Sequence, residues 1–247
     1  MFLRELRTQQ RLFWRSYEAA FFTFFLPILF LVLLGTVYGD EEIAGIRGST
    51  YLLAGLLGYG VVATAFAGLA ITLVVRRESG VLKRVRGTPL PTWVYLGAVV
   101  ASTLVVIALQ VAAQVAVGRF LLDSGWPAAP GALVLALLLG AVAFSALGLA
   151  ATSVVRSAEG SSAVVNAIYL PLTFISGVFF SVESLPGFLR ALAEVSPLTY
   201  LLELLRAVFV DGSGLGANTT EVIVLAAWGL AGAAVALRWF RWEPREA

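Results

Sequence analysis

The sequence contains no cysteine and no histidine, and its 247 residues include a single lysine, Lys83. Without cysteine there is no disulfide, no thiolate nucleophile and no sulfur-ligated metal. Without histidine the usual catalytic triads, most zinc sites and imidazole proton relays are excluded. Charged residues make up only 13% of the chain, against about a quarter in ordinary globular domains, whereas 60% of residues are hydrophobic and the mean hydropathy is +0.91. This composition predicts a membrane protein, and the net charge of +2 argues against a nucleic-acid partner.

Apolar runs of about twenty residues are long enough to cross a bilayer. Six segments are predicted to do so: Ala19–Tyr38, Tyr51–Val75, Trp93–Leu121, Gly131–Val155, Ser162–Val182 and Val222–Leu237. The last has only sixteen uncharged residues and would place Glu221 and Arg238 at the two interfaces. The first run lacks a small-residue cleavage site, so we expect it to be retained. The predicted fold is an all-α membrane protein with six transmembrane helices.

The distribution of basic residues predicts the orientation of the chain. With both termini in the cytoplasm, thirteen basic residues lie inside: Arg4, Arg7, Arg11, Arg15, Arg76, Arg77, Lys83, Arg84, Arg86, Arg156, Arg238, Arg241 and Arg245. Four lie outside: Arg47, Arg119, Arg190 and Arg206. Because cytoplasmic loops carry the excess of Lys and Arg, this bias favours cytoplasmic termini.

Residues 2–18 precede the first span and carry Arg4, Arg7, Arg11 and Arg15 at spacings of three or four. This spacing puts the four arginines on one face of a helix. We expect an amphipathic helix on the inner leaflet, with its basic face toward lipid headgroups or a partner protein. The alternative is an anchor that only fixes orientation.

The stretch RRESGVLKRVRGTPLP, residues 76–91, joins the second and third spans. We expect residues 77–86 to form one short helix, with Glu78 near its start and basic residues near its end. Val81, Leu82 and Val85 would form an apolar stripe available to a partner. Gly87 would take a left-handed conformation after the helix, followed by two prolines. The alternative is a loop that only satisfies the orientation rule.

Residues 183–221 form the longest outer segment and are expected to hold two short helices, Ser184–Ala193 and Pro197–Val210. The second is apolar but too short to cross a bilayer, which is typical of a re-entrant or interfacial helix. Its Glu203 and Arg206 lie at i,i+3 and can pair on one face.

Polar and small residues interrupt three of the predicted spans. Gln110 and Gln114 share one face of the third span, and Asn166, Tyr169 and Thr173 form a polar stripe on the fifth. Hydrogen bonding between helices and lining of a path are both open for these residues. Gly55, Gly58 and Gly60 in the second span would permit close helix approach or bending.

The chain lacks an ATP site of the P-loop kind, because the residue before Lys83 is Leu82 and not glycine. The interiors of the predicted spans contain no Asp or Glu to relay protons. We therefore expect no enzyme activity and no cofactor on this chain, with ATP and Mg²⁺ bound by a separate polypeptide. Sodium coupling through backbone carbonyls stays open.

The chain resembles the membrane (permease) subunit of type-2 ABC exporters, which include drug-resistance, nodulation-factor and polysaccharide or lipid export permeases. The motifs are RRESGVLKRVRGTPLP, ISGVFFSVESLPGFLRAL at 175–192 and SPLTYLLELLRA at 196–207. Ser196 and Glu203 depart from the Asn and Asp common in relatives. The resemblance covers nearly the whole length and implies export outward across a bacterial cytoplasmic membrane, powered by two copies of an ATP-binding subunit. It also implies a second permease subunit, expected to be the same chain, and contact with membrane lipids.

The resemblance assigns a role to each part of the chain. Residues 1–18 would be the connecting helix, 19–182 the first five spans, 183–221 the re-entrant pair with its linker, and 222–247 the sixth span and tail. The ATPase-coupling residues would be Arg77, Glu78, Gly80, Val81, Leu82, Lys83, Arg84 and Arg86. Candidate path residues are Gly58, Asn166, Tyr169 and Thr173, and those of the outer helix are Pro197, Tyr200, Glu203 and Arg206.

Three other classes of function are weighed against an exporter of hydrophobic or amphipathic molecules. A stand-alone secondary transporter or channel is the main alternative. A non-transport scaffold leaves the organised loop and the outer helices unexplained. An intramembrane enzyme lacks the histidine, cysteine or buried carboxylates that such chemistry uses.

Overall fold

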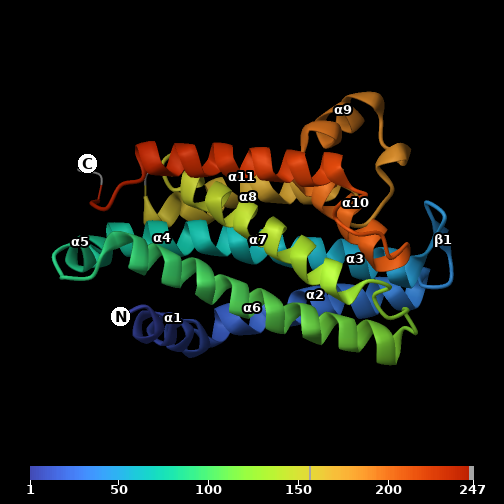
Figure 1. The fold of residues 1–247 in the computed structure, drawn as a ribbon, viewed down its shortest axis with the longest axis horizontal. Coiled ribbons are helices and arrows are strands. Elements are labelled where there is room, and N and C mark those ends of the chain that lie inside the picture. Colours follow the sequence, from blue (N-terminus) through green and yellow to red (C-terminus); the bar gives the residue numbers. More distant parts are fainter. Residues whose placement is uncertain (156, 245–247) are drawn as a thin grey trace.

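The computed structural model describes residues 1–155 and 157–244 as a bundle of helices that run roughly along one direction. Two of the basic residues assigned to the cytoplasm, Arg156 and Arg245, lie outside the described residues. The start of α1 (Phe2–Arg15), the short helix α5 (Val81–Arg86) and the end of α11 (Thr219–Trp239) lie at one end of the bundle (Figure 1). Below, this is called the α5 end.

Five helical segments in the described part of the chain are long and apolar enough to cross a membrane. They are α2 (Tyr17–Tyr38), the rod Gly48–Glu78, α6 (Thr92–Leu121), α7 (Pro130–Ala151) and α11. The rod is one continuous helix that contains α3 (Gly48–Val61), the π-helical segment η1 (Val62–Gly68) and α4 (Leu69–Glu78). These five segments correspond to five of the six predicted spans.

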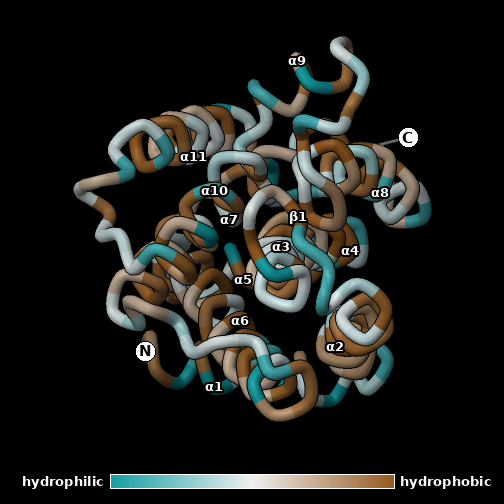
Figure 2. Tube along the Cα trace, turned by 90° about the vertical axis from the view of Figure 1, so that its right-hand side faces the viewer, coloured by the Kyte–Doolittle hydropathy of each residue, from teal (hydrophilic) through white to brown (hydrophobic). Residues whose placement is uncertain are grey.

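The predicted fifth span, Ser162–Val182, is shorter than expected. It forms α8 (Ala158–Ile175), which begins earlier, carries Glu159 in its first turn and is not among the five segments above. The helix ends because Gly177 takes a positive φ of 91°, which turns the chain back toward the bundle. Five spans are thus supported by length and composition, and α8 is a less apolar helix alongside them (Figure 2).

The end of the bundle opposite α5 carries the short elements. A two-stranded hairpin pairs β1 (Glu42–Ile43) with β2 (Ile46–Arg47), in a loop where no strand is predicted from sequence. The 3₁₀ turn η2 (Val182–Ser184) and α9 (Gly187–Val195) follow α8, and α9 starts later than expected because Pro186 precedes its first turn. The helix α10 (Pro197–Val210) has the predicted bounds, since the Ser196 side chain caps it by accepting from the Leu198 N–H.

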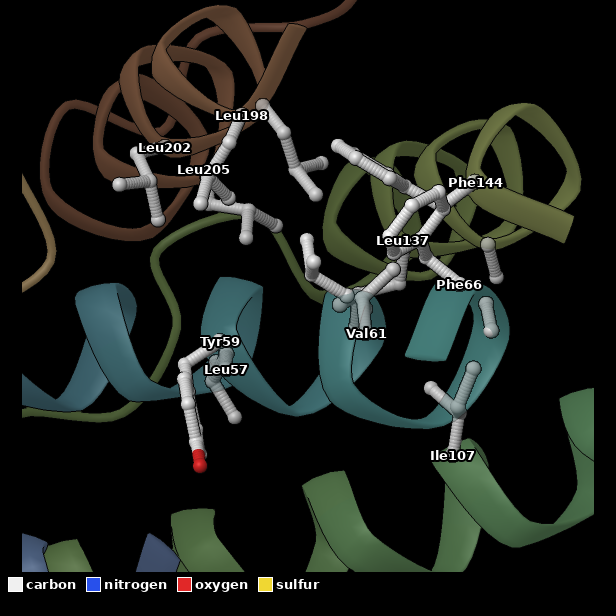
Figure 3. Packing of buried hydrophobic residues seen from close by; sticks show 14 of the residues in the cluster. Leu57, Tyr59, Val61, Phe66, Ile107, Leu137, Phe144, Leu198, Leu202 and Leu205 are labelled. Atoms are coloured by element: carbon white, nitrogen blue, oxygen red, sulfur yellow. The ribbon is translucent and has the colours of Figure 1, made fainter. Parts of the chain in front are cut away.

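The core is built around α3, in which every residue except Thr50 is buried. Figure 3 shows Leu198, Leu202 and Leu205 of α10 facing α3, with Phe144 and Leu137 of α7 beside them. Helices in a membrane gain little from excluding water from one another, so close packing of small residues has to hold them together. The rod, which contains α3, lies in the middle of the bundle, where it packs closely against its neighbours (Figure 2).

Three glycines of α3 provide this close packing. A Cβ on Gly55 would lie 2.3 Å from the carbonyl oxygen of Val178, one on Gly58 would lie 2.4 Å from a methyl of Leu202, and one on Gly60 would lie 2.5 Å from the Gln110 amide nitrogen. Each glycine therefore allows a different neighbouring segment to pack closely against α3. Of the two interpretations made from sequence, close helix approach is confirmed at Gly58 and Gly60, whereas Gly55 admits the turn that follows α8.

Candidate functional site

The charged segment 76–91 consists of two helices and not one. The rod ends at Glu78, Gly80 takes a left-handed conformation with φ 72°, and α5 begins at Val81. Glu78 is therefore the last residue of α4, so its predicted place at the start of a helix is wrong. The prediction of a left-handed Gly87 is also wrong, because Gly87 has φ −79° and the reversal occurs at Gly80.

Arg77 is the centre of this segment, with a side chain that is only 1% exposed. Its Nε donates to Glu78 Oε1 at 2.7 Å, its Nη1 to the carbonyl of Thr152 at 2.8 Å and its Nη2 to the carbonyl of Val155 at 2.8 Å. The first of these two carbonyls belongs to the C-cap residue of α7, where carbonyls have no partner within the helix, and the second lies in the turn that follows. Arg77 thus fastens the end of the rod to the end of α7.

Leu82 is fully buried, and the expectation that its stripe is available to a partner is wrong for this residue. It packs in a cluster with Leu69, Leu73, Tyr95 and Val99, which Phe240 and Trp242 partly cover. Val81 and Val85 are half-buried on the same helix. The apolar face of α5 therefore holds the helix against the bundle.

The opposite face of α5 is basic and exposed. Lys83, Arg84 and Arg86 are all exposed, and Gly80 is half-buried in the turn before them. A six-residue helix pinned on one side by Leu82 and preceded by the Arg77 anchor presents these cations in a fixed arrangement. We call these three residues the α5 basic face.

The amphipathic helix α1 lies beside this segment and packs on α6. The four predicted arginines, Arg4, Arg7, Arg11 and Arg15, are all exposed. Two glutamines that sequence reasoning did not single out hold the helix in place. Gln9 accepts from Arg76 Nη1 at 2.7 Å, and Gln10 donates to the Ser102 carbonyl at 2.9 Å. Both glutamines lie off the helix face that carries the arginines, and this feature of the sequence could have indicated that they contact the bundle.

The candidate path residues of the fifth predicted span meet the rod. The hydroxyls of Tyr59 and Tyr169 lie 3.2 Å apart, and Thr173 donates to the Tyr169 carbonyl at 2.8 Å. Asn166 is half-buried on α8, whereas Gly58 is covered by Leu202. The structure therefore brings Tyr169 together with the rod and places Gly58 under α10.

The two glutamines of α6 are buried against the rod. Thr64 of η1 donates to Gln110 Oε1 at 3.3 Å, which gives one hydrogen bond between helices. Within the described residues, the Gln110 amide nitrogen and both polar atoms of the Gln114 amide have no partner. Such buried polar atoms reduce stability, because their loss of hydration is not compensated.

We expect Gln114→Leu to stabilise the chain by about 1–3 kcal/mol, because it removes two unpartnered polar atoms at similar volume. Thermal unfolding of the purified protein in detergent measures this. Gln110→Leu is the matched control and should gain less, since it also removes the Thr64 hydrogen bond. An unchanged or lower melting temperature for Gln114→Leu would show that its amide is satisfied in the working assembly.

The outer helix α10 differs from expectation in its charges. Within the described residues Glu203 and Arg206 form no ion pair, although their i,i+3 spacing allows one. Arg206 instead donates to the Gly177 carbonyl, which also accepts from the Tyr51 hydroxyl at 3.0 Å, and its guanidinium lies 3.7 Å from the Tyr51 ring centroid. Burial raises the pKa of Glu203, Glu221 adds to this, and Arg206 opposes it.

The other two outer residues predicted from sequence are structural in this arrangement. Pro197 is the first residue of α10, where its missing N–H costs no hydrogen bond. The Tyr200 hydroxyl donates to the Glu194 carbonyl of α9 at 2.9 Å. Among the described residues no group of three or more acidic side chains could hold a metal ion.

Comparison with known proteins identifies the family. A model of the family described as "ABC-2 type transporter" matches residues 2–210. This chain belongs to that family. The ABC-2 permease is 29% identical over 200 residues to the Inner membrane transport permease YadH of Escherichia coli K12, covering 79% of this chain and 73% of that protein. It is 25% identical over 232 residues to the Putative transport permease ycf38 of Porphyra purpurea, covering 89% and 77%.

Family membership and the long apolar helices together make this ABC-2 permease a multi-pass protein of the cytoplasmic membrane. It is a membrane component of an ABC transporter, a class in which an ATP-binding subunit is the partner. The resemblance stated from the sequence motifs is therefore confirmed.

Proposed function

We propose that this permease is the transmembrane subunit of an ATP-driven exporter for a hydrophobic or amphipathic molecule such as a drug, lipid or glycolipid. A separate ATP-binding subunit, with its own ATP and Mg²⁺, docks on segment 76–91 at the cytoplasmic side. The complex contains two ATP-binding subunits and a second permease, which is another copy of this chain.

The observation that carries this proposal is the α5 basic face. Its three exposed cations lie on a helix whose other face packs into a buried cluster. This helix is at the end of the bundle where both basic ends of the chain also lie (Figure 1). A loop whose only role was to fix the orientation of the chain would need the basic residues. It would not need the buried contacts of Arg77 and Leu82 that hold α5 in place.

The predicted coupling residues differ in their exposure. Arg77 and Leu82 are buried, so they position α5 and have no surface left for a partner. Lys83, Arg84 and Arg86 are exposed and would contact the ATP-binding subunit. Glu78, with a side chain 19% exposed, would act mainly by neutralising Arg77.

The path is proposed to run along the rod and α8, with Tyr59, Tyr169 and Asn166 toward it. The surrounding side chains are largely apolar, and a highly charged substrate would lose its hydration there without compensation.

The helix α1 would act as the connecting helix, with its four arginines toward lipid headgroups. The α9–α10 pair would be the outer re-entrant pair.

Replacing Arg84 and Arg86 by glutamate should abolish co-purification of the ATP-binding subunit while leaving the melting temperature unchanged, because both side chains are exposed. Mass spectrometry of the complex isolated from its native membrane, together with ATP hydrolysis, measures this. Arg238→Glu with Arg241→Glu is the matched control, since it makes the same charge change at the same end of the bundle. Normal recovery of the partner by the Arg84/Arg86 variant, or equal loss in both variants, contradicts docking on α5.

The alternative function, a stand-alone secondary transporter or channel, makes the opposite prediction. It requires ion-gradient-driven flux in liposomes that contain this chain alone, without nucleotide.

A further inference from the structure

A cavity of about 560 Å³ lies at the end of the bundle opposite α5, between α2, the hairpin loop and the segment that follows α8. Its volume is in the range of small-molecule sites. Its lining combines four phenylalanines with two carboxylates: Phe30, Phe174, Phe179, Phe180, Glu41 and Glu42. None of them belongs to the coupling segment or to the path residues discussed above.

The walls of this cavity are aromatic. The Phe179 ring lies near the middle of a chain of rings, 5.9 Å from Phe30, 5.6 Å from Phe174 and 6.5 Å from Phe180 by ring centroids. Phe174 and Phe180 are more than half exposed at the cavity surface. Aromatic ring faces carry negative potential and attract organic cations as well as apolar groups.

The charged residues that line the cavity are both acidic, and Arg47 stands opposite one of them, Glu42, in the hairpin. Glu41 and Glu42 line it, and both are exposed. Arg47, the one basic residue of the hairpin loop, is bound to Asp40 at 3.0 Å and lies 3.8 Å from Asp123. The lining residues include no lysine or arginine. The carboxylates of Glu41 and Glu42 are therefore not neutralised by the cavity's own residues.

We propose that this cavity binds a lipophilic organic cation, with the apolar body among the phenylalanines and the positive charge toward Glu41 and Glu42. The two carboxylates disfavour an anionic phospholipid headgroup, and an uncharged occupant would gain no electrostatic attraction from them. The cation–π and carboxylate contributions act together, since both lie within one cavity. That the bound cation is also exported rests on the function proposed above, but binding does not.

The absence of cysteine from the chain allows a direct test at the cavity. Ser184→Cys places one thiol in the lining, and its rate of maleimide labelling in nanodiscs can be followed with and without a probe. Tetraphenylphosphonium, a lipophilic cation, is expected to slow labelling saturably. Tetraphenylborate, an anion of nearly the same size and shape, should not. Ala191→Cys on the exposed surface of α9 is the control and should be insensitive to both.

Substitutions in the cavity then separate the two contributions. In the Ser184→Cys background, Glu41→Gln with Glu42→Gln should raise the apparent Kd for tetraphenylphosphonium roughly tenfold. Phe179→Leu, which keeps an apolar side chain but removes the ring, should raise it several-fold. Glu194→Gln, an exposed outer carboxylate that does not line the cavity, should leave it unchanged.

Three outcomes would overturn the proposal: no saturable protection by tetraphenylphosphonium, equal protection by tetraphenylborate, or an unchanged Kd in the double glutamine variant. A fourth is disulfide formation between the introduced thiols of two Ser184→Cys copies before any labelling, which would show that a second chain covers the cavity. None of these measurements needs an ATP-binding subunit. Failure of the coupling experiment on α5 would therefore leave this result standing, and the reverse also holds.

Discussion

Arg77→Ala is expected to destabilise the permease by about 3 kcal/mol, at the lower end of the range for breaking a buried ion pair because Glu78 is partly exposed. The substitution removes three hydrogen bonds at once and leaves the carbonyls of Thr152 and Val155 without their donors. It also separates the end of the rod from the end of α7, so α5 loses its fixed position. We expect ATP hydrolysis by the complex to become independent of substrate.

Thermal unfolding of the isolated permease, together with ATPase stimulation in the reconstituted complex, measures both effects. Arg84→Ala is the control, because this arginine is exposed on the same segment and its loss should not change the melting temperature. Arg77→Lys should rescue little, since one ammonium cannot reproduce the three-way geometry of the guanidinium. A melting temperature unchanged in Arg77→Ala would refute the anchoring role.

Gly55→Ala is expected to destabilise the permease by about 1–3 kcal/mol. The added Cβ would lie 2.3 Å from the carbonyl oxygen of Val178, which is backbone and cannot rotate away. Alanine gains about 1 kcal/mol in helix propensity, which offsets only part of this cost. The displaced turn also carries Gly177, so the hydrogen bonds from Tyr51 and Arg206 should weaken with it.

Two glycine substitutions serve as controls in the same unfolding assay. Gly58→Ala meets only the end of the flexible Leu202 side chain and should cost less. Gly131→Ala meets nothing within 4 Å and should be neutral or slightly stabilising. If Gly55→Ala were as stable as Gly131→Ala, the close contact between α3 and the turn at Val178 would not exist in the folded protein.

Much of the architecture could be predicted because it depends on local sequence. Runs of apolar residues predicted the spans, and Ser196 followed by Pro197 predicted the start of α10, since capping involves neighbouring residues only. The α5 region shows where local patterns fail. Its sequence has glycines at 80 and 87, and nothing local indicates which one reverses the backbone.

Tertiary contacts account for the remaining differences. Spacing correctly placed Leu82 and Val85 on one face, but Phe240 and Trp242, which pack against the same cluster, come from the far end of the chain. The acceptors of Arg77 are likewise distant carbonyls, and carbonyls carry no sequence signal. The cavity at the opposite end was missed for the same reason, because its phenylalanines come from α2 and from the segment around the end of α8.

The continuous rod also has a mechanical consequence. Its 31 residues span about 45 Å at helical rise, and about 33 Å of this separates Gly55, which contacts the turn at Val178, from the Arg77 anchor beside α5. A hydrogen-bonded helix resists axial compression, so an axial displacement of α5 reaches the outer turn along a single stiff backbone. The seven-residue segment η1 is where the winding of the rod changes. Torsional strain transmitted along the rod would therefore concentrate in η1. This segment packs against Gly148 of α7, a position at which there is no room for a Cβ.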